Sequence, residues 1–128
     1  MSFNFWMYRA APGLGPFTQW PGMLAEDLGP RAEIRRVLET LLHSLKWISG
    51  EGTQISGEAI DPRYDSAYRL SLHENESGAV CFITTTNHAS PQTLSVIMDR
   101  FSLNYCCTDF GDFRQPHRCD DNWNVVNP

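Results

Sequence analysis

The chain has 128 residues, a net charge of −5 and 41% hydrophobic residues, so it is long enough for one domain with its own apolar core. This composition excludes a disordered chain, a coiled coil and a collagen-like repeat, and no apolar stretch reaches the ~20 residues that a membrane-spanning helix needs. The excess of acidic residues also argues against binding to a nucleic-acid backbone, which relies on clustered Lys and Arg. We therefore expect one globular domain that contacts neither nucleic acid nor membrane.

The first predicted element is a strand over residues 3–9, where bulky side chains alternate on both faces. Residues 10–30 follow with four Gly and four Pro, a density of breakers that no regular element tolerates. We expect a long loop here, part of which packs on the body through residues such as Phe17 and Trp20.

A helix is predicted after Pro30, which suits the first turn of a helix. Apolar residues recur with helical spacing up to Leu45, and Lys46 would then complement the negative end of the helix dipole. The predicted buried stripe consists of Ile34, Val37, Leu38, Leu41, Leu42 and Leu45.

Three strands are expected in the middle of the chain. Residues 53–60 alternate weakly and suit an edge strand, whereas residues 68–72 and 79–85 alternate well and should form a hairpin around the polar turn at 74–78. A second helix begins at Ser90, followed by Pro at its first helical position, and a last strand covers residues 103–108.

The order β-α-β-β-β-α-β predicts an α+β two-layer sandwich, with a mixed or antiparallel sheet of about four to five strands and two helices. The domain is expected to span residues 1–112. The aperiodic tail, 113–128, either wraps the body through Phe113 or Trp123 or stays loose.

No residue pattern indicates catalysis, a metal or a cofactor. Cys106, Cys107, His117 and Cys119 are potential zinc ligands, but neighbouring residues of a strand point to opposite faces and no C-x-x-C pair is present. The pair Cys81 and His88 is too widely spaced along one strand for nucleophilic catalysis. We therefore expect no catalytic residue, no metal site and no cofactor.

The compartment is expected to be the cytoplasm. The first residues lack the basic segment, apolar core and cleavage site of a secretory signal. Without export the four cysteines would remain reduced thiols.

The acidic residues are concentrated in one segment, because residues 51–76 carry a net charge of −4. Such a surface suits a protein partner with a basic surface and speeds encounter by electrostatic steering; the alternative is a solvated face that only aids solubility. Tyr64 would act as an aromatic anchor among the carboxylates. The predicted partner-binding residues are Glu51, Glu58, Asp61, Tyr64, Asp65, Glu74 and Glu76.

Four features of the chain also resemble those of a known protein family. These are the aromatic opening FNFWMY at residues 3–8, the Leu-rich helix, the hairpin and the ending LNYCCTDFGD at residues 103–112. In element order the chain resembles the small bacterial immunity proteins that are encoded beside secreted toxins. The resemblance implies an acidic cytoplasmic inhibitor that blocks a toxin or effector domain by occlusion, and it assigns no functional residue. The alternative is a small-ligand sensor or small enzyme with a pocket between the sheet and the loop at residues 10–30.

Overall fold

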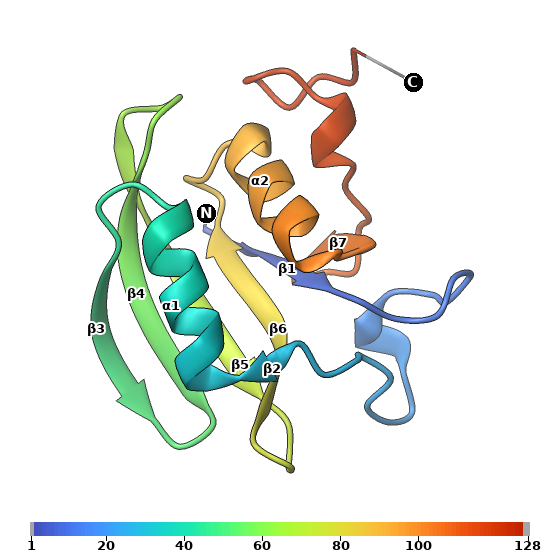
Figure 1. Ribbon diagram of the computed structural model, residues 1–128. Helices are drawn as coiled ribbons and strands as arrows, with labels where there is room; N and C mark the ends of the chain where they lie inside the picture. Colours follow the sequence, from blue (N-terminus) through green and yellow to red (C-terminus); the bar gives the residue numbers. More distant parts are fainter. Residues whose placement is uncertain (1, 127–128) are drawn as a thin grey trace.

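The computed structural model describes residues 2–126, apart from the side chain of Glu51. Within this range a seven-stranded sheet forms one layer, and two helices lie on one of its faces (Figure 1). The α+β class and the antiparallel sheet with two helices are thereby confirmed. The strands are β1 Asn4–Tyr8, β2 Gly29–Pro30, β3 Lys46–Glu51, β4 Gln54–Asp61, β5 Ser66–Glu74, β6 Ala79–Thr86 and β7 Tyr105–Thr108; the helices are α1 Arg31–Leu41 and α2 Pro91–Phe101.

The sheet has the order β3-β4-β5-β6-β1-β7, with β2 paired to β6, and every pair is antiparallel. The predicted hairpin is β5–β6, in which Leu72 lies opposite Ile83. The prediction that residues 53–60 form an edge strand is wrong, because β3 pairs with β4 and takes the edge itself. A register shift between Trp47 and Ser49 interrupts the alternation of β3, so the sequence pattern of this strand is weak.

Helix α1 is shorter than its apolar pattern predicts. Leu42 already has the extended conformation (φ −106°, ψ 140°), and Ser44 has the left-handed conformation with φ 58°. Lys46 is therefore the first residue of β3 rather than part of the last helical turn. The buried residues of the helix itself are Ile34 and Leu38.

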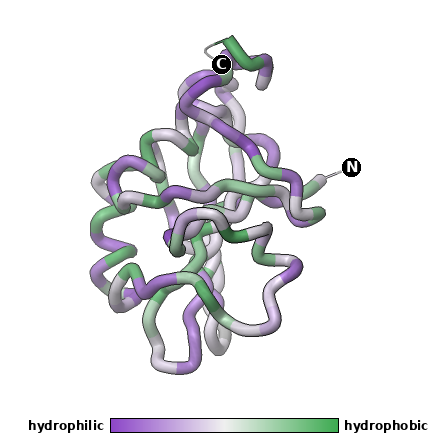
Figure 2. Tube along the Cα trace, turned by 90° about the vertical axis from the view of Figure 1, so that its right-hand side faces the viewer, coloured by the Kyte–Doolittle hydropathy of each residue, from purple (hydrophilic) through white to green (hydrophobic). Residues whose placement is uncertain are grey.

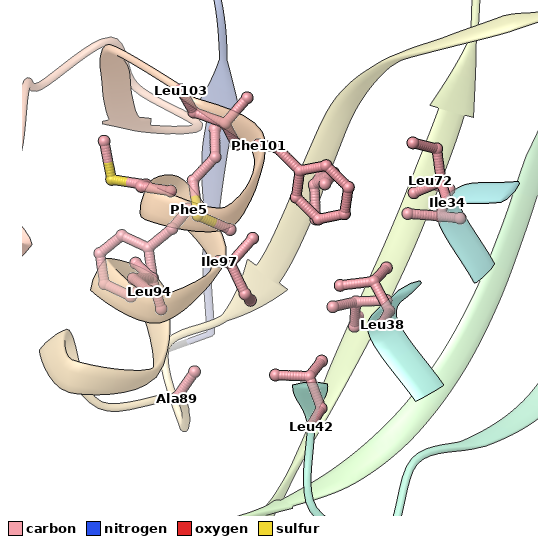
Figure 3. Close-up of a cluster of buried hydrophobic side chains, with 14 of the residues drawn as sticks. Phe5, Ile34, Leu38, Leu42, Leu72, Ala89, Leu94, Ile97, Phe101 and Leu103 are labelled. Carbon is pink, nitrogen blue, oxygen red and sulfur yellow. The ribbon is translucent and has the colours of Figure 1, made fainter. Parts of the chain in front are cut away.

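The main core lies between the helices and the sheet. Figure 3 shows Ile97 and Phe101 of α2 turned toward Ile34 and Leu38 of α1 and toward Leu42, the residue that follows α1. Leu94 of α2 belongs to the same core. Phe5 and Leu72 lie beneath them on the sheet. This apolar burial is the main stabilising contribution to the fold.

The loop between β1 and β2 covers part of the other face of the sheet. Phe17 packs on Trp6 with ring centroids 4.7 Å apart, and Trp20 packs on Tyr8 at 5.2 Å. The Tyr105 hydroxyl donates to the Ala11 carbonyl at 2.7 Å and fixes the start of the loop. Aromatic rings thus fill the space between this loop and the sheet, which is where the alternative prediction places a ligand pocket.

The described part of the C-terminal segment wraps the body. Trp123 stacks on Phe5 with centroids 4.7 Å apart, and the Tyr64 hydroxyl donates to the Asp121 carbonyl at 2.6 Å. Figure 2 shows this segment at the end of the molecule opposite the β3–β4 and β5–β6 turns. Of the two predicted arrangements, residues 113–126 adopt the wrapped one, anchored by Trp123. No helix within residues 2–126 combines the length and apolarity that a membrane crossing requires.

Candidate functional site

The predicted partner-binding residues do not form one surface. Because β4 spans eight residues at about 3.3 Å per residue, its two ends are roughly 23 Å apart. Glu58 lies between them on β4. The turn β4–β5 carries Asp61, Tyr64 and Asp65, while the turns at the opposite end carry Glu51, Glu74 and Glu76. The side chain of Glu51 lies outside the described part of the chain.

Asp61 is fully buried, so it cannot contact a partner directly. Its predicted place in the partner-binding surface is therefore corrected. One carboxylate oxygen accepts hydrogen bonds from the backbone N–H groups of Arg63 and Tyr64, both at 2.9 Å. The other accepts from the Ser90 N–H at 2.6 Å and the Thr93 hydroxyl at 2.8 Å. Burial alone would raise the pKa of Asp61, but these hydrogen bonds outweigh it and hold the pKa below its ordinary value. Asp61 joins the β4–β5 turn to the start of α2.

Tyr64 is not a free anchor either. It is half-buried, and its hydroxyl is occupied by the carbonyl of Asp121. Asp65 is exposed and has the left-handed conformation, with φ 52°, which Asp tolerates better than most residues. Of the predicted residues at this end, only Asp65 offers a free carboxylate to a partner.

Glu58 is exposed on the face of the sheet that the helices do not cover. Its cross-strand neighbours are Lys46 on β3 and Arg69 on β5. Oppositely charged residues in this position balance one another. Glu58 therefore adds little net negative charge to the surface.

The end of the sheet at the β5–β6 turn is built from three segments that are tied together. Arg31 forms an ion pair with Glu74 and also donates to the Gly52 carbonyl at 2.8 Å, so it links the β5–β6 and β3–β4 turns. Asn75 donates to the Asp27 carboxylate and joins the β5–β6 turn to the loop before β2. Glu74 is largely buried by its ion pair, whereas Glu76 and Asp27 are exposed.

Between these segments lies an open hollow of about 770 Å³, to which Met23 contributes from the loop and Thr53 from the β3–β4 turn. Met23 is 57% exposed and the adjacent Leu24 is 44% exposed. We call Met23, Asp27, Glu74 and Glu76 the acidic end. Sequence reasoning missed Met23 and Asp27, because they lie some fifty positions from Glu74 and only the fold brings them together. The available signal was an apolar pair, Met23-Leu24, one residue before the acidic pair Glu26-Asp27.

The cysteines lie where the strand alternation predicts. Cys106 belongs to the core under the helices and Cys107 to the aromatic cluster on the other face, and burial raises the pKa of both thiols. Within residues 2–126, no three His, Cys, Asp or Glu side chains gather in a way that could hold a metal ion.

The acidic end presents an exposed apolar residue, Met23, at a hollow that is also lined by Glu74 and Glu76, an arrangement suited to a partner side chain with both apolar and cationic parts. Comparisons of the chain with protein-family models, with curated proteins and with solved structures found no match.

Proposed function

We propose that the chain is a non-catalytic protein-binding module, an immunity-type protein that neutralises a bacterial toxin or effector domain by occluding its surface. The observation that carries the proposal is the exposed Met23 at a hollow whose walls include Glu74 and Glu76. An apolar centre with a polar rim is the usual anatomy of a protein interface. Single exposed apolar residues are common, but Met23 and Leu24 stand together beside a concave surface.

Charge supports a basic partner. The chain carries −5, and Glu76 and Asp27 are both exposed at the acidic end. Exposed charges of this kind mainly raise the association rate by steering. Glu74 has another role, because Arg31 neutralises it and the pair shapes the wall of the hollow.

The acidic end is organised before any partner arrives. Asn75 accepts hydrogen bonds from the Ser77 and Ala79 backbone N–H groups at 3.0 and 3.2 Å, which fixes the β5–β6 turn. Arg31 and Asp27 then tie this turn to its neighbours. A preorganised surface loses less conformational entropy on binding than a mobile one.

The test is protection from a toxin. Secreted toxin domains encoded next to the gene for this chain are sought, and each one found is expressed in bacteria with and without the chain, and surviving colonies are counted. We expect wild type to restore growth and the double variant Met23→Ala, Glu76→Lys to lose most of that protection. The matched control is Phe110→Ala, Asp112→Lys, which removes an exposed apolar residue and reverses a charge away from the acidic end.

Thermal unfolding of both double variants checks that each still folds. The proposal is contradicted if wild type gives no protection. The placement of the binding surface at the acidic end is contradicted if the control variant loses protection and the Met23→Ala, Glu76→Lys variant keeps it.

A further inference from the structure

A second hollow lies at the opposite end of the sheet, between the end of α1, the start of α2 and the β4–β5 turn. It has a volume of about 490 Å³, within the range typical of small-molecule sites. Its walls are largely apolar, with Leu42, Ile60, Pro62 and Val96 among them. We call this hollow the inter-helix cleft.

Tyr68 lines the inter-helix cleft and is only 2% exposed. No group within residues 2–126 forms a hydrogen bond with its hydroxyl, although the hydroxyls of Tyr64 and Tyr105 each have a partner. The Tyr68 oxygen is not one of the sealed side-chain atoms that lack a partner, so its hydroxyl is open to the cleft that the residue lines and is free to donate to a molecule bound there. We propose that the inter-helix cleft binds a small uncharged apolar molecule whose carbonyl oxygen accepts a hydrogen bond from Tyr68.

The charges around the inter-helix cleft favour a neutral ligand. Asp61 is close enough to raise the pKa of Tyr68, a shift caused first by burial and then by this carboxylate, so an anionic group at the hydroxyl would be repelled. A cation cannot be coordinated directly by Asp61, because each of its oxygens already accepts two hydrogen bonds, and the largely apolar walls would not replace the water that the cation loses. At the mouth, the Nε of Arg63 donates to the Gln92 side-chain oxygen and lies 3.7 Å from the Asp121 carboxylate, which offsets its positive charge.

The class of ligand follows from this chemistry: an aromatic or branched aliphatic ketone, ester or amide. The apolar part would pack against Leu42, Ile60 and Val96, and the carbonyl would point to Tyr68. The inter-helix cleft and the acidic end lie at opposite ends of β4 and β5, so this site is independent of the proposed protein interface.

The experiment is a titration followed by amide NMR shifts, with acetophenone as the probe. The comparison compound is α-methylstyrene, which has nearly the same shape but a methylene group in place of the carbonyl oxygen. In wild type we expect shifts at Leu42, Ile60 and Val96, and a dissociation constant about three- to tenfold lower for acetophenone, the effect of one hydrogen bond.

Tyr68→Phe keeps the ring and removes the hydroxyl, so it should bind the two compounds equally. Tyr64→Phe removes a neighbouring hydroxyl outside the cleft lining and should keep the wild-type preference. The proposal is overturned if acetophenone shifts no cleft residue, if wild type binds both compounds equally, or if Tyr68→Phe retains the preference. Thermal unfolding of Tyr68→Phe shows that a lost preference does not reflect a lost fold.

Discussion

Asp61 shows how an acidic residue in a polar loop can be structural rather than part of a binding surface. Its place before Pro62 suggested an exposed turn, but both of its oxygens are filled by donors from the turn and from α2. Two of these donors, Ser90 and Thr93, lie about thirty positions further along the chain. No local pattern reveals such a partner.

Asp61→Asn should destabilise the fold at pH 7 by about 2–4 kcal/mol, because an amide has one acceptor oxygen and its NH2 group would face hydrogen-bond donors that now point at the carboxylate.

The pH dependence of stability should also differ between wild type and Asp61→Asn. The pKa of Asp61 is lowered in the folded state, so the unfolded state takes up the proton first as the pH falls below about 4, and wild type loses stability there. Urea unfolding of both proteins from pH 7 to pH 2.5 tests this; an equally steep acid loss in Asp61→Asn would contradict it.

His73 should act in a different pH window. Its ring stacks on Trp6 with centroids 4.8 Å apart, its Nε2 lies 3.1 Å from the Thr84 hydroxyl, and burial lowers its pKa. The unfolded state therefore binds a proton first as the pH falls below about 6.5, and stability declines from there until the folded-state pKa is reached. His73→Gln should flatten the stability profile between pH 7.5 and 5; an unchanged slope would show that His73 does not contribute.

At the scale of single elements, the sequence predicts best where periodicity is clean. The β5–β6 hairpin and α2 follow from strict alternation and from the Ser90-Pro91 start, and Ser90 does accept a hydrogen bond from the Thr93 N–H at 3.3 Å. The end of α1 was missed because Leu42 and Leu45 continue the apolar spacing after the backbone has turned. Strand β3 is absent from the strands predicted above, because its register shifts between Trp47 and Ser49 and its side chains do not alternate regularly.

The core of α1 can be tested with two leucines. Leu38 is 0% exposed, whereas Leu41 is only partly buried. Leu38→Ala should cost about 2–5 kcal/mol of stability through lost burial and a cavity, and Leu41→Ala should cost clearly less. Urea denaturation measures both; equal losses would mean that Leu41 faces the core as the longer predicted helix requires.

At the scale of the whole molecule, the order of the predicted elements indicates the class of fold but not the arrangement of the surface. Residues 51–76 hold most of the net charge, yet strand length places Glu76 and Asp65 at opposite ends of the sheet. The acidic end also depends on Met23 and Asp27, which reach the β5–β6 turn only because the loop before β2 folds back along the sheet. Such long-range neighbours cannot be deduced from local patterns.

The acidic end should act chiefly through long-range charge. The Debye length is about 10 Å at 0.1 M salt and about 3 Å at 1 M salt, so steering by Glu76 should be strong only at low ionic strength. Met23 should instead act on dissociation, because apolar anchors affect the lifetime of a complex more than its formation.

The most direct measurement is the association rate with the purified toxin domain for wild type, Glu76→Lys and Asp112→Lys, at 0.1 M and at 1 M salt. Glu76→Lys should associate about three- to tenfold more slowly than wild type at 0.1 M and nearly equally at 1 M. Asp112→Lys, the same charge change away from the acidic end, should stay close to wild type at both. Equal rates for Glu76→Lys and wild type at low salt, with slowed association of Asp112→Lys, would contradict binding through the acidic end.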